Sequence, residues 1–436
     1  MKKLLFVWKQ LNTTFWFLPT FIICLSIVLV IFILRLDEVI TISTDGLGRF
    51  FFVNSIESAR SLLTTIAGAM IGVAGTVFSI TLVALSLTTS QLGSRQIRNF
   101  MYHKLNQFVL GSYISTFVCC VIILNVVNKF DNGIFIPHLT ILFATVLSIA
   151  NIILLIFFIH NVAVSIQANS VVAEISKELS DNLNTMFPES FGDETNKTLS
   201  EESLEDTKLN YPIKHDLILG SSGYLQYMDN EKLLSKAEKL DVILQIDCRP
   251  GNYMVQGVKA GLIYSKEILS EKQLQQFQTF FITGNTRTSE QDAEHSIHQL
   301  VEIASRALSP GINDPYTAIA CIDNLTKSMV FLSSVDFPSK YRLDKNNNLR
   351  AIIHNLSFES MLDAAFNQIR QFSKDSPSVV IRLMDALTTI NKFVKLKEQK
   401  EAVKKHAIMV LNLGKNRFDE PNDFKDLEKR AKSILD

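Results

Sequence analysis

The stretch that decides the fold is residues 61–94, SLLTTIAGAMIGVAGTVFSITLVALSLTTSQLGS, which contains no charged residue. A membrane-spanning helix needs about 20 mostly apolar residues, so this run is long enough to cross a bilayer. At helical spacing, one side of the run collects small and hydroxylated residues three, four or seven positions apart. These stripe residues are Gly68, Gly72, Gly75, Thr76, Ser79, Ser86 and Ser90. Leu, Ile, Val and Phe fill the other side, so the stripe must face another helix or water.

Three further segments have the length and composition of membrane spans: residues 14–34, 105–127 and 138–162. The first is too long for the apolar part of a secretory signal, so we expect an uncleaved helix. Basic residues favour the N-terminus and the loop after the second span, whereas the loop after the first span is mostly acidic. The positive-inside rule then places both termini in the cytoplasm. We therefore expect an integral membrane protein with cytoplasmic termini.

Charge and cysteine usage exclude several classes of function. The formal net charge is zero, which offers no bulk basic surface for nucleic acid. The five cysteines show neither C-x-x-C spacing nor a zinc-type pairing with histidine. This usage fits a reduced cytoplasmic setting without a disulfide framework, and we expect no cofactor.

The fold class expected for the whole chain is an α-helical membrane protein with four transmembrane helices, plus a cytoplasmic α+β region. The transmembrane domain covers residues 1–165, and a helical extension with an acidic linker covers 166–212. A small β-rich subdomain follows at 213–266, and a helical bundle at 267–436. No glycine occurs from 138 to 186, so the fourth span is expected to continue past the membrane as one stiff helix. The acidic, Ser- and Thr-rich composition of 181–212 predicts a solvated linker.

Local signals place several elements of the cytoplasmic half. Asp229 is a predicted N-cap for a helix at 230–240, and Asp314 before Pro315 has the same role for a later one. Ser289 with Asp292 resembles a capping box. Residues 345–348 predict a hairpin turn between strands 341–343 and 349–353. Helices are expected at 267–283, 289–308, 315–333, 358–372, 377–394, 398–413 and 421–435.

Residues 305–318, SRALSPGINDPYTA, closely resemble an uncharacterised family of predicted bacterial membrane proteins (domain of unknown function 2254). The likeness continues in GTVFS at 75–79, TSQ at 89–91, SGYLQ at 222–226, TRT at 286–288 and QD at 291–292. It covers nearly the whole chain. The resemblance implies architecture only, and no activity or functional residue follows from it.

The loop within that motif is a candidate ligand site. Its proline and glycine break one helix, and free backbone amides at the start of the next, with Arg287 and Arg306 if they fold nearby, could bind a small anion or a nucleotide phosphate. The more common explanation is a tight corner between two helices, whose polar residues satisfy backbone groups. The candidate residues are Arg306, Ser309, Gly311, Asn313 and Asp314.

Evidence for metal chemistry or catalysis is weak. His295 and His298 lie three apart near Glu294 and Glu302, but such a helix face is more often solvated, and we predict no metal site. There is no G-x-S-x-G, Walker A or H-E-x-x-H motif. We therefore predict that the protein is not an enzyme.

The stripe of the second span is the strongest candidate site. Gly68, Gly72 and Gly75 form a small-residue surface on which helices can pack closely. The half nearer the cytoplasm could line a pore, with Arg95 and Arg98 at its mouth or acting only as topology determinants. The pore-lining candidates are Thr76, Ser79, Val83, Ser86 and Ser90.

Four spans enclose too little space for a pore of their own, so a pore requires several copies around an axis. The first hypothesis is a homo-oligomeric ion channel or transporter in the lipid bilayer, gated by its cytoplasmic domain. The alternative is a non-conducting membrane scaffold or sensor that binds a cytoplasmic ligand or partner. A membrane-tethered enzyme comes third.

Overall fold

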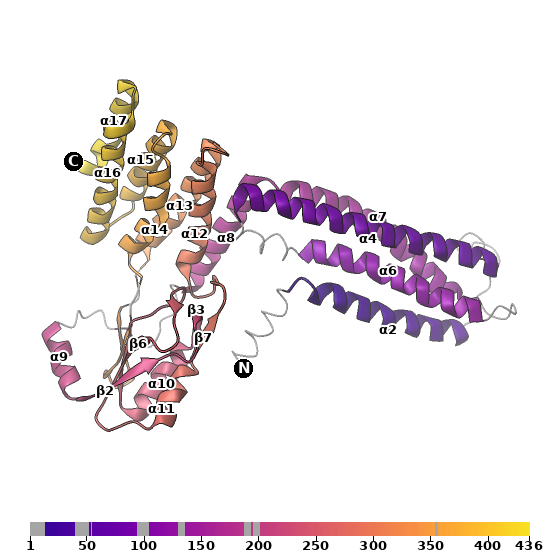
Figure 1. Cartoon of the computed structure of the whole chain (residues 1–436), viewed down its shortest axis with the longest axis horizontal. Coiled ribbons are helices and arrows are strands. Elements are labelled where there is room, and N and C mark those ends of the chain that lie inside the picture. Colours follow the sequence, from indigo (N-terminus) through magenta and orange to yellow (C-terminus); the bar gives the residue numbers. More distant parts are fainter. Residues whose placement is uncertain are drawn as a thin grey trace. The chain divides into compact units, whose positions relative to one another are not determined.

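The computed structural model describes residues 14–39, 52–53, 55–93, 104–129, 136–186, 193–194, 201–335, 337, 339–353 and 356–436. The chain divides into two compact units, Met1–Ser170 and Val171–Asp436 (Figure 1). Each unit is described by itself below.

Four long apolar helices make up the first unit: α2 (Phe17–Val39), α4 (Ile56–Leu92), α6 (Lys104–Lys129) and α7 (His138–Ser165). Each is long and apolar enough to span a membrane. The prediction of four apolar helices is therefore confirmed, and α4 contains almost all of the uncharged run. α6 packs against each of the other three helices (Figure 1).

Two polar contacts tie helices of this apolar unit together. The buried side chain of Asn151 in α7 accepts a hydrogen bond from Ser112 of α6 (2.6 Å) and donates one to Thr116 of α6 (2.8 Å). At one end of the unit, Asp37 of α2 accepts a hydrogen bond from the backbone N–H of Thr140 in the first turn of α7 (2.9 Å). Because polar groups in apolar surroundings need partners, these bonds favour one packing of α2, α6 and α7.

The chain is interrupted just after the fourth span. α7 ends at Ser165, and α8 (Ala168–Met186) begins three residues later. Between them the N–H of Gln167 bonds to the carbonyl of Val164, and the N–H of Ser170 bonds to that of Gln167. These are i to i+3 turns, tighter than the α-helical pattern. The predicted continuous helix is therefore wrong, because an absence of glycine and proline permits a helix without enforcing one.

The acidic segment 181–212 contains regular structure where it is described. α8 continues to Met186, strand β1 (Asp193–Glu194) pairs with β8, and helix α9 (Glu201–Leu209) precedes the next strand. The composition identified the segment as polar, but it did not reveal these elements.

The second unit contains two sheets. Sheet A has the strand order β1-β8-β9-β4-β6-β2, and sheet B has the order β5-β3-β7. The pair β4 and β9 is parallel, and the other described pairs are antiparallel. The strands are β2 (Ile213–Ile218), β3 (Gly223–Met228), β4 (Ile243–Ile246), β5 (Tyr253–Met254), β6 (Lys259–Ser265), β7 (Phe281–Gly284), β8 (Tyr341–Leu343) and β9 (Leu349–Ile353).

Two helices pack on one face of sheet A, α10 (Asn230–Leu240) and α11 (Glu271–Gln278). As predicted, Asp229 caps α10, with its side chain accepting from the N–H of Lys232. The helix predicted at 267–283 is wrong beyond Gln278, because the β-forming residues of β7 pair with β3 instead. The predicted hairpin β8–β9 is confirmed.

The remaining helices form three hairpins stacked in two layers (Figure 1). α12, α14 and α16 pack in sequence in one layer, and α13, α15 and α17 in the other. Ion pairs join neighbouring helices of the second layer, as between Asp323 and Arg382 (2.6 Å). The helices are α12 (Ala293–Ala307), α13 (Pro315–Ser334), α14 (Phe358–Phe372), α15 (Pro377–Asn391), α16 (Lys397–Arg417) and α17 (Pro421–Leu435).

Candidate functional site

The stripe of α4 lies on the outer surface of the first unit. The residues of α4 that pack into the apolar core include Met70, Val77 and Ala84. Ser86 lies nine positions after Val77, which is two and a half helical turns and therefore the opposite side of the helix. The seven stripe residues and the pore-lining candidate Val83 are all exposed in the single chain, namely Gly68, Gly72, Gly75, Thr76, Ser79, Val83, Ser86 and Ser90.

The three glycines of the stripe touch no other part of the described chain. A Cβ atom added at Gly68, Gly72 or Gly75 would meet nothing within 4 Å. Glycine inside a helix costs about 1 kcal/mol relative to alanine, and no contact with the described residues offsets that cost. If these glycines serve close packing, the partner lies outside the described residues of this chain.

Some hydroxyl groups of the stripe bond to their own helix, whereas others make no hydrogen bond within the described part of the chain. Thr76 donates to the carbonyl of Gly72 (3.2 Å), and Ser90 donates to that of Leu87 (2.9 Å). Such back-bonding satisfies a hydroxyl without water. In the described part of the chain, the hydroxyls of Ser79 and Ser86 make no hydrogen bond. The predicted mouth residues, Arg95 and Arg98, lie outside the described residues.

The loop between α12 and α13 folds as a compact corner. The N–H of Asn313 bonds to the carbonyl of Ser309 (2.9 Å), and the N–H of Asp314 bonds to that of Ala307 (2.8 Å). Asn313 adopts a positive φ of 49°, which asparagine tolerates better than most residues. The Asp314 carboxylate accepts from the N–H of Thr317 (3.1 Å), as predicted for an N-cap. These bonds use backbone amides that a bound anion would need. Gly311 is exposed, with nothing within 4 Å of an added Cβ.

The two arginines considered for that loop lie at opposite ends of α12. Arg306 is in its last turn. Arg287 precedes the helix and pairs with Asp292 through Nη2 and Oδ2 (2.6 Å). The two therefore do not converge on the loop. The predicted capping box is wrong, because α12 begins after Asp292, whose side chain bonds to Arg287 and makes no cap bond.

This pairing belongs to a partly buried cluster at the start of α12. Arg249 reaches Glu294 from the turn before β5 (2.8 Å), and a ring nitrogen of His298 lies 3.0 Å from Arg287 Nη1. Burial raises the pKa of Asp292 despite the adjacent guanidinium of Arg287. The cluster links the turn of sheet B to the helical stack. No group of histidine, cysteine and acidic residues suited to a metal ion occurs among the described residues.

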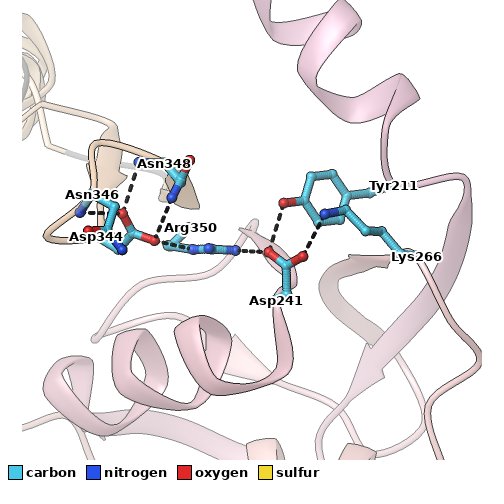
Figure 2. Close-up of polar contacts among 7 residues, drawn as sticks. All are labelled: Tyr211, Asp241, Lys266, Asp344, Asn346, Asn348 and Arg350. Atoms are coloured by element: carbon cyan, nitrogen blue, oxygen red, sulfur yellow. Dashed lines mark hydrogen bonds and ion pairs between the residues drawn. The ribbon is translucent and has the colours of Figure 1, made fainter.

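A second polar cluster joins four segments of sheet A and its surroundings (Figure 2). The side chain of Arg350 on β9 bridges Asp241 (2.6 Å) and the buried Asp344 (2.7 Å). Asp241 also pairs with Lys266 (2.6 Å) and accepts from the hydroxyl of Tyr211 (3.0 Å). The hydrogen bonds from Lys266 and Arg350 lower the pKa of Asp241 to about 2.

Asp344 is held by its own turn as well as by Arg350. Its Oδ1 atom accepts from the backbone N–H groups of Asn346 (2.8 Å) and Asn348 (2.9 Å) (Figure 2). Burial by itself would raise the pKa of Asp344, but the hydrogen bonds from Asn348 and Arg350 lower it. The polar groups of the cluster are paired with one another, so it stabilises the fold and leaves little chemistry for a ligand. The turn signal at 345–348 was visible in the sequence, but the long-range pairing was not.

Comparisons with known proteins agree with the membrane architecture. The model of a family described as "Predicted membrane protein (DUF2254)" matches residues 12–389. An uncharacterized protein of Mycobacterium bovis and one of Mycobacterium tuberculosis are each 26% identical over 380 residues, covering 86% of this chain and 72% of the relative. No solved structure shows a significant match.

Proposed function

The chain belongs to this family of predicted membrane proteins, and from that premise we propose that it forms a homo-oligomeric ion channel or transporter. In this proposal it resides in the bacterial inner membrane, both termini are cytoplasmic, and it is not an enzyme. The main observation that supports this proposal is that the stripe of α4 faces outward, opposite the packed side of the helix.

The chemistry of the stripe favours a polar environment for its second half. A hydroxyl buried in hydrocarbon without a partner is unfavourable, and Ser79 and Ser86 lack a partner within the described chain. Copies arranged around an axis with α4 innermost would turn these hydroxyls towards water or towards each other. Hydroxyls along a narrow path can replace part of an ion's hydration shell.

The length of α4 supports the same arrangement. Its 37 residues span about 55 Å at 1.5 Å per residue, against about 30 Å for the hydrocarbon core of a bilayer. A tilt of ordinary size does not absorb this excess. Ser86 and Ser90 at the C-terminal end of the stripe are therefore suited to the cytoplasmic mouth of the path.

The open space beside the glycines favours a second candidate function. Gly68 and Gly72 allow close approach of another α4 helix. Direct contact along the whole stripe would close the path and give a non-conducting scaffold or sensor. Whether the protein conducts ions distinguishes the channel or transporter from the scaffold or sensor.

The test is ion flux through the purified full-length protein in liposomes. The wild type should pass small ions, and Ser79→Phe and Ser86→Phe should each reduce the flux by blocking the path while the oligomer stays intact. Ile80→Phe is the matched control, because Ile80 is also exposed but lies about 100° around the helix from Ser79. It should leave the flux unchanged.

Two outcomes count against conduction. Absence of flux for every ion tested, across voltage and pH, contradicts the channel. If the oligomer conducts no ions and Gly72→Leu dissociates it, the stripe acts as a packing surface and the scaffold is the correct function. A protein that is strictly monomeric in detergent and in nanodiscs contradicts both the channel and the scaffold.

A further inference from the structure

The two faces of sheet A are covered to different degrees. One face packs against α10 and α11 in an extensive apolar core that includes Leu233 and Phe277. The other face, called the open face below, carries an aromatic and apolar cluster of Tyr211, Ile243, Tyr264, Tyr341 and Leu349, flanked by the half-buried Leu262, Leu343 and Ile352.

Helix α9 lies against this open face and stands apart from the other helices of the unit (Figure 1). It is held by side chains. Leu204 packs on the cluster, and Lys208 donates to the side chain of Gln245 (3.0 Å) while lying over the ring of Tyr264 (5.1 Å). Contacts of this kind are individually weak, so α9 belongs to the part of the fold that opens most easily.

The amino-acid composition of α9 is complementary in charge to the exposed rim of this face. Four of the nine residues of α9 are acidic, in the sequence EESLEDTKL. The open face carries exposed lysines over its aromatic rings, with Lys214 over Tyr264 (5.7 Å) and Lys340 over Tyr341 (5.0 Å). An apolar centre with a basic rim is complementary to a short acidic helix with one apolar side.

We propose that the open face of sheet A is a docking surface for an acidic amphipathic helix of a partner protein, and that α9 is the resident competitor. The partner helix places an apolar residue where Leu204 lies and acidic residues beside Lys214 and Lys340. Release of α9 makes the face available, so the affinity for the partner depends on how firmly α9 is held. The proposal does not depend on conduction.

The test uses the full-length protein in nanodiscs and a fluorescent peptide of residues 199–211 as the probe. Leu204→Asp weakens the resident helix at its partly buried apolar contact. Leu209→Asp is the matched control on the same helix, because Leu209 is 74% exposed. We expect Leu204→Asp to bind the peptide about tenfold more tightly than the wild type does, since burial of a leucine contributes on this scale. Leu209→Asp should match the wild type, and a peptide with its acidic residues replaced by lysine should not bind.

The integrity of the unit is measured in parallel from the protection of Cys248 and Cys321, both buried, against a thiol reagent. If Leu204→Asp keeps this protection and still does not bind the peptide, the docking surface is contradicted. If Leu204→Asp exposes these cysteines, α9 is an integral part of the core and the proposal is wrong. If Leu204→Asp forms a larger oligomer, the face binds a second copy of this chain and the proposal is wrong. If the variant binds anionic phosphatidylglycerol vesicles in place of the peptide, the face binds lipid and the proposal is also wrong.

Discussion

The sharpest stability prediction concerns Arg350→Met. The guanidinium of Arg350 lies between two carboxylates, and its side chain is 7% exposed. Methionine keeps much of the side-chain volume but removes the charge. Asp344, whose side chain is fully buried, then loses its only cationic partner among the described residues, although it keeps the hydrogen bonds of its own turn.

The magnitude follows from the burial of the two carboxylates. Removing one partner of a buried ion pair costs about 3–5 kcal/mol, because a charge stays buried without its counter-charge. Asp241 adds little to this cost, since it is half exposed and retains Lys266 and Tyr211. We expect the free energy of unfolding of the second unit to fall by about 3–5 kcal/mol. Lys266→Met is the control on an exposed pair, with an expected loss of about 0–1 kcal/mol.

Two buried cysteines supply the assay. Burial raises the pKa of Cys248 to about 11 and that of Cys321 to about 12, so both thiols are unreactive in the folded unit. Labelling with a maleimide in increasing urea, followed by peptide mass spectrometry, gives the fraction unfolded at each site. A loss below about 1 kcal/mol in Arg350→Met, the level of an exposed pair, refutes the reasoning. The double variant Arg350→Met, Asp344→Asn should recover part of the lost free energy of unfolding, because it neutralises the unpaired carboxylate. If it recovers none, the reasoning is also refuted.

Three further predictions rest on single contacts. Replacing Asn151 with alanine removes the acceptor of the Ser112 hydroxyl, while Thr116 still donates to the carbonyl of Ser112, and should destabilise the first unit by about 1–2 kcal/mol, measured as earlier labelling of its buried cysteines in denaturant. Asp37→Ala removes the cap of α7 and should cost about 1–2 kcal/mol, seen as about tenfold faster hydrogen exchange at Thr140; unchanged exchange contradicts the cap. The pKa of Asp241 is lowered in the folded state to about 2 from an ordinary 3.8, so its contribution to stability is complete above pH 3.8 and is lost as the pH falls towards 2. Urea titrations between pH 5 and 2 should show this loss, and Arg350→Met should reduce its size.

Local sequence signals predicted local structure well. The four apolar helices follow from uninterrupted composition, and the caps at Asp229 and Asp314 follow from residues within a few positions of the helix start. The turn before Leu349 was predicted on the same grounds. In each case the physical cause lies inside a short window of sequence.

Structure that depends on distant partners was not predicted. Arg350 and Asp241 are 109 residues apart in the sequence, and neither position has a local pattern that identifies the other. Periodicity showed that α4 has a stripe, but the direction of the stripe depends on which side packs against α6. The break near Gln167 has no glycine or proline to mark it. The strand β7 was assigned to a helix because its pairing partner, β3, lies more than 50 residues earlier.

The stacked hairpins of the second unit determine how it comes apart. The hairpin α12–α13 packs on α14–α15, which in turn packs on α16–α17. Energy in such an array resides mainly in interfaces between adjacent repeats, so the outermost hairpin can melt while the rest remains native. Cys321 in α13 and Cys248 near sheet A both lie in the inner part of the unit, so their labelling does not report the melting of α16–α17. Loss of α16–α17 can therefore precede the transition that the two cysteines report.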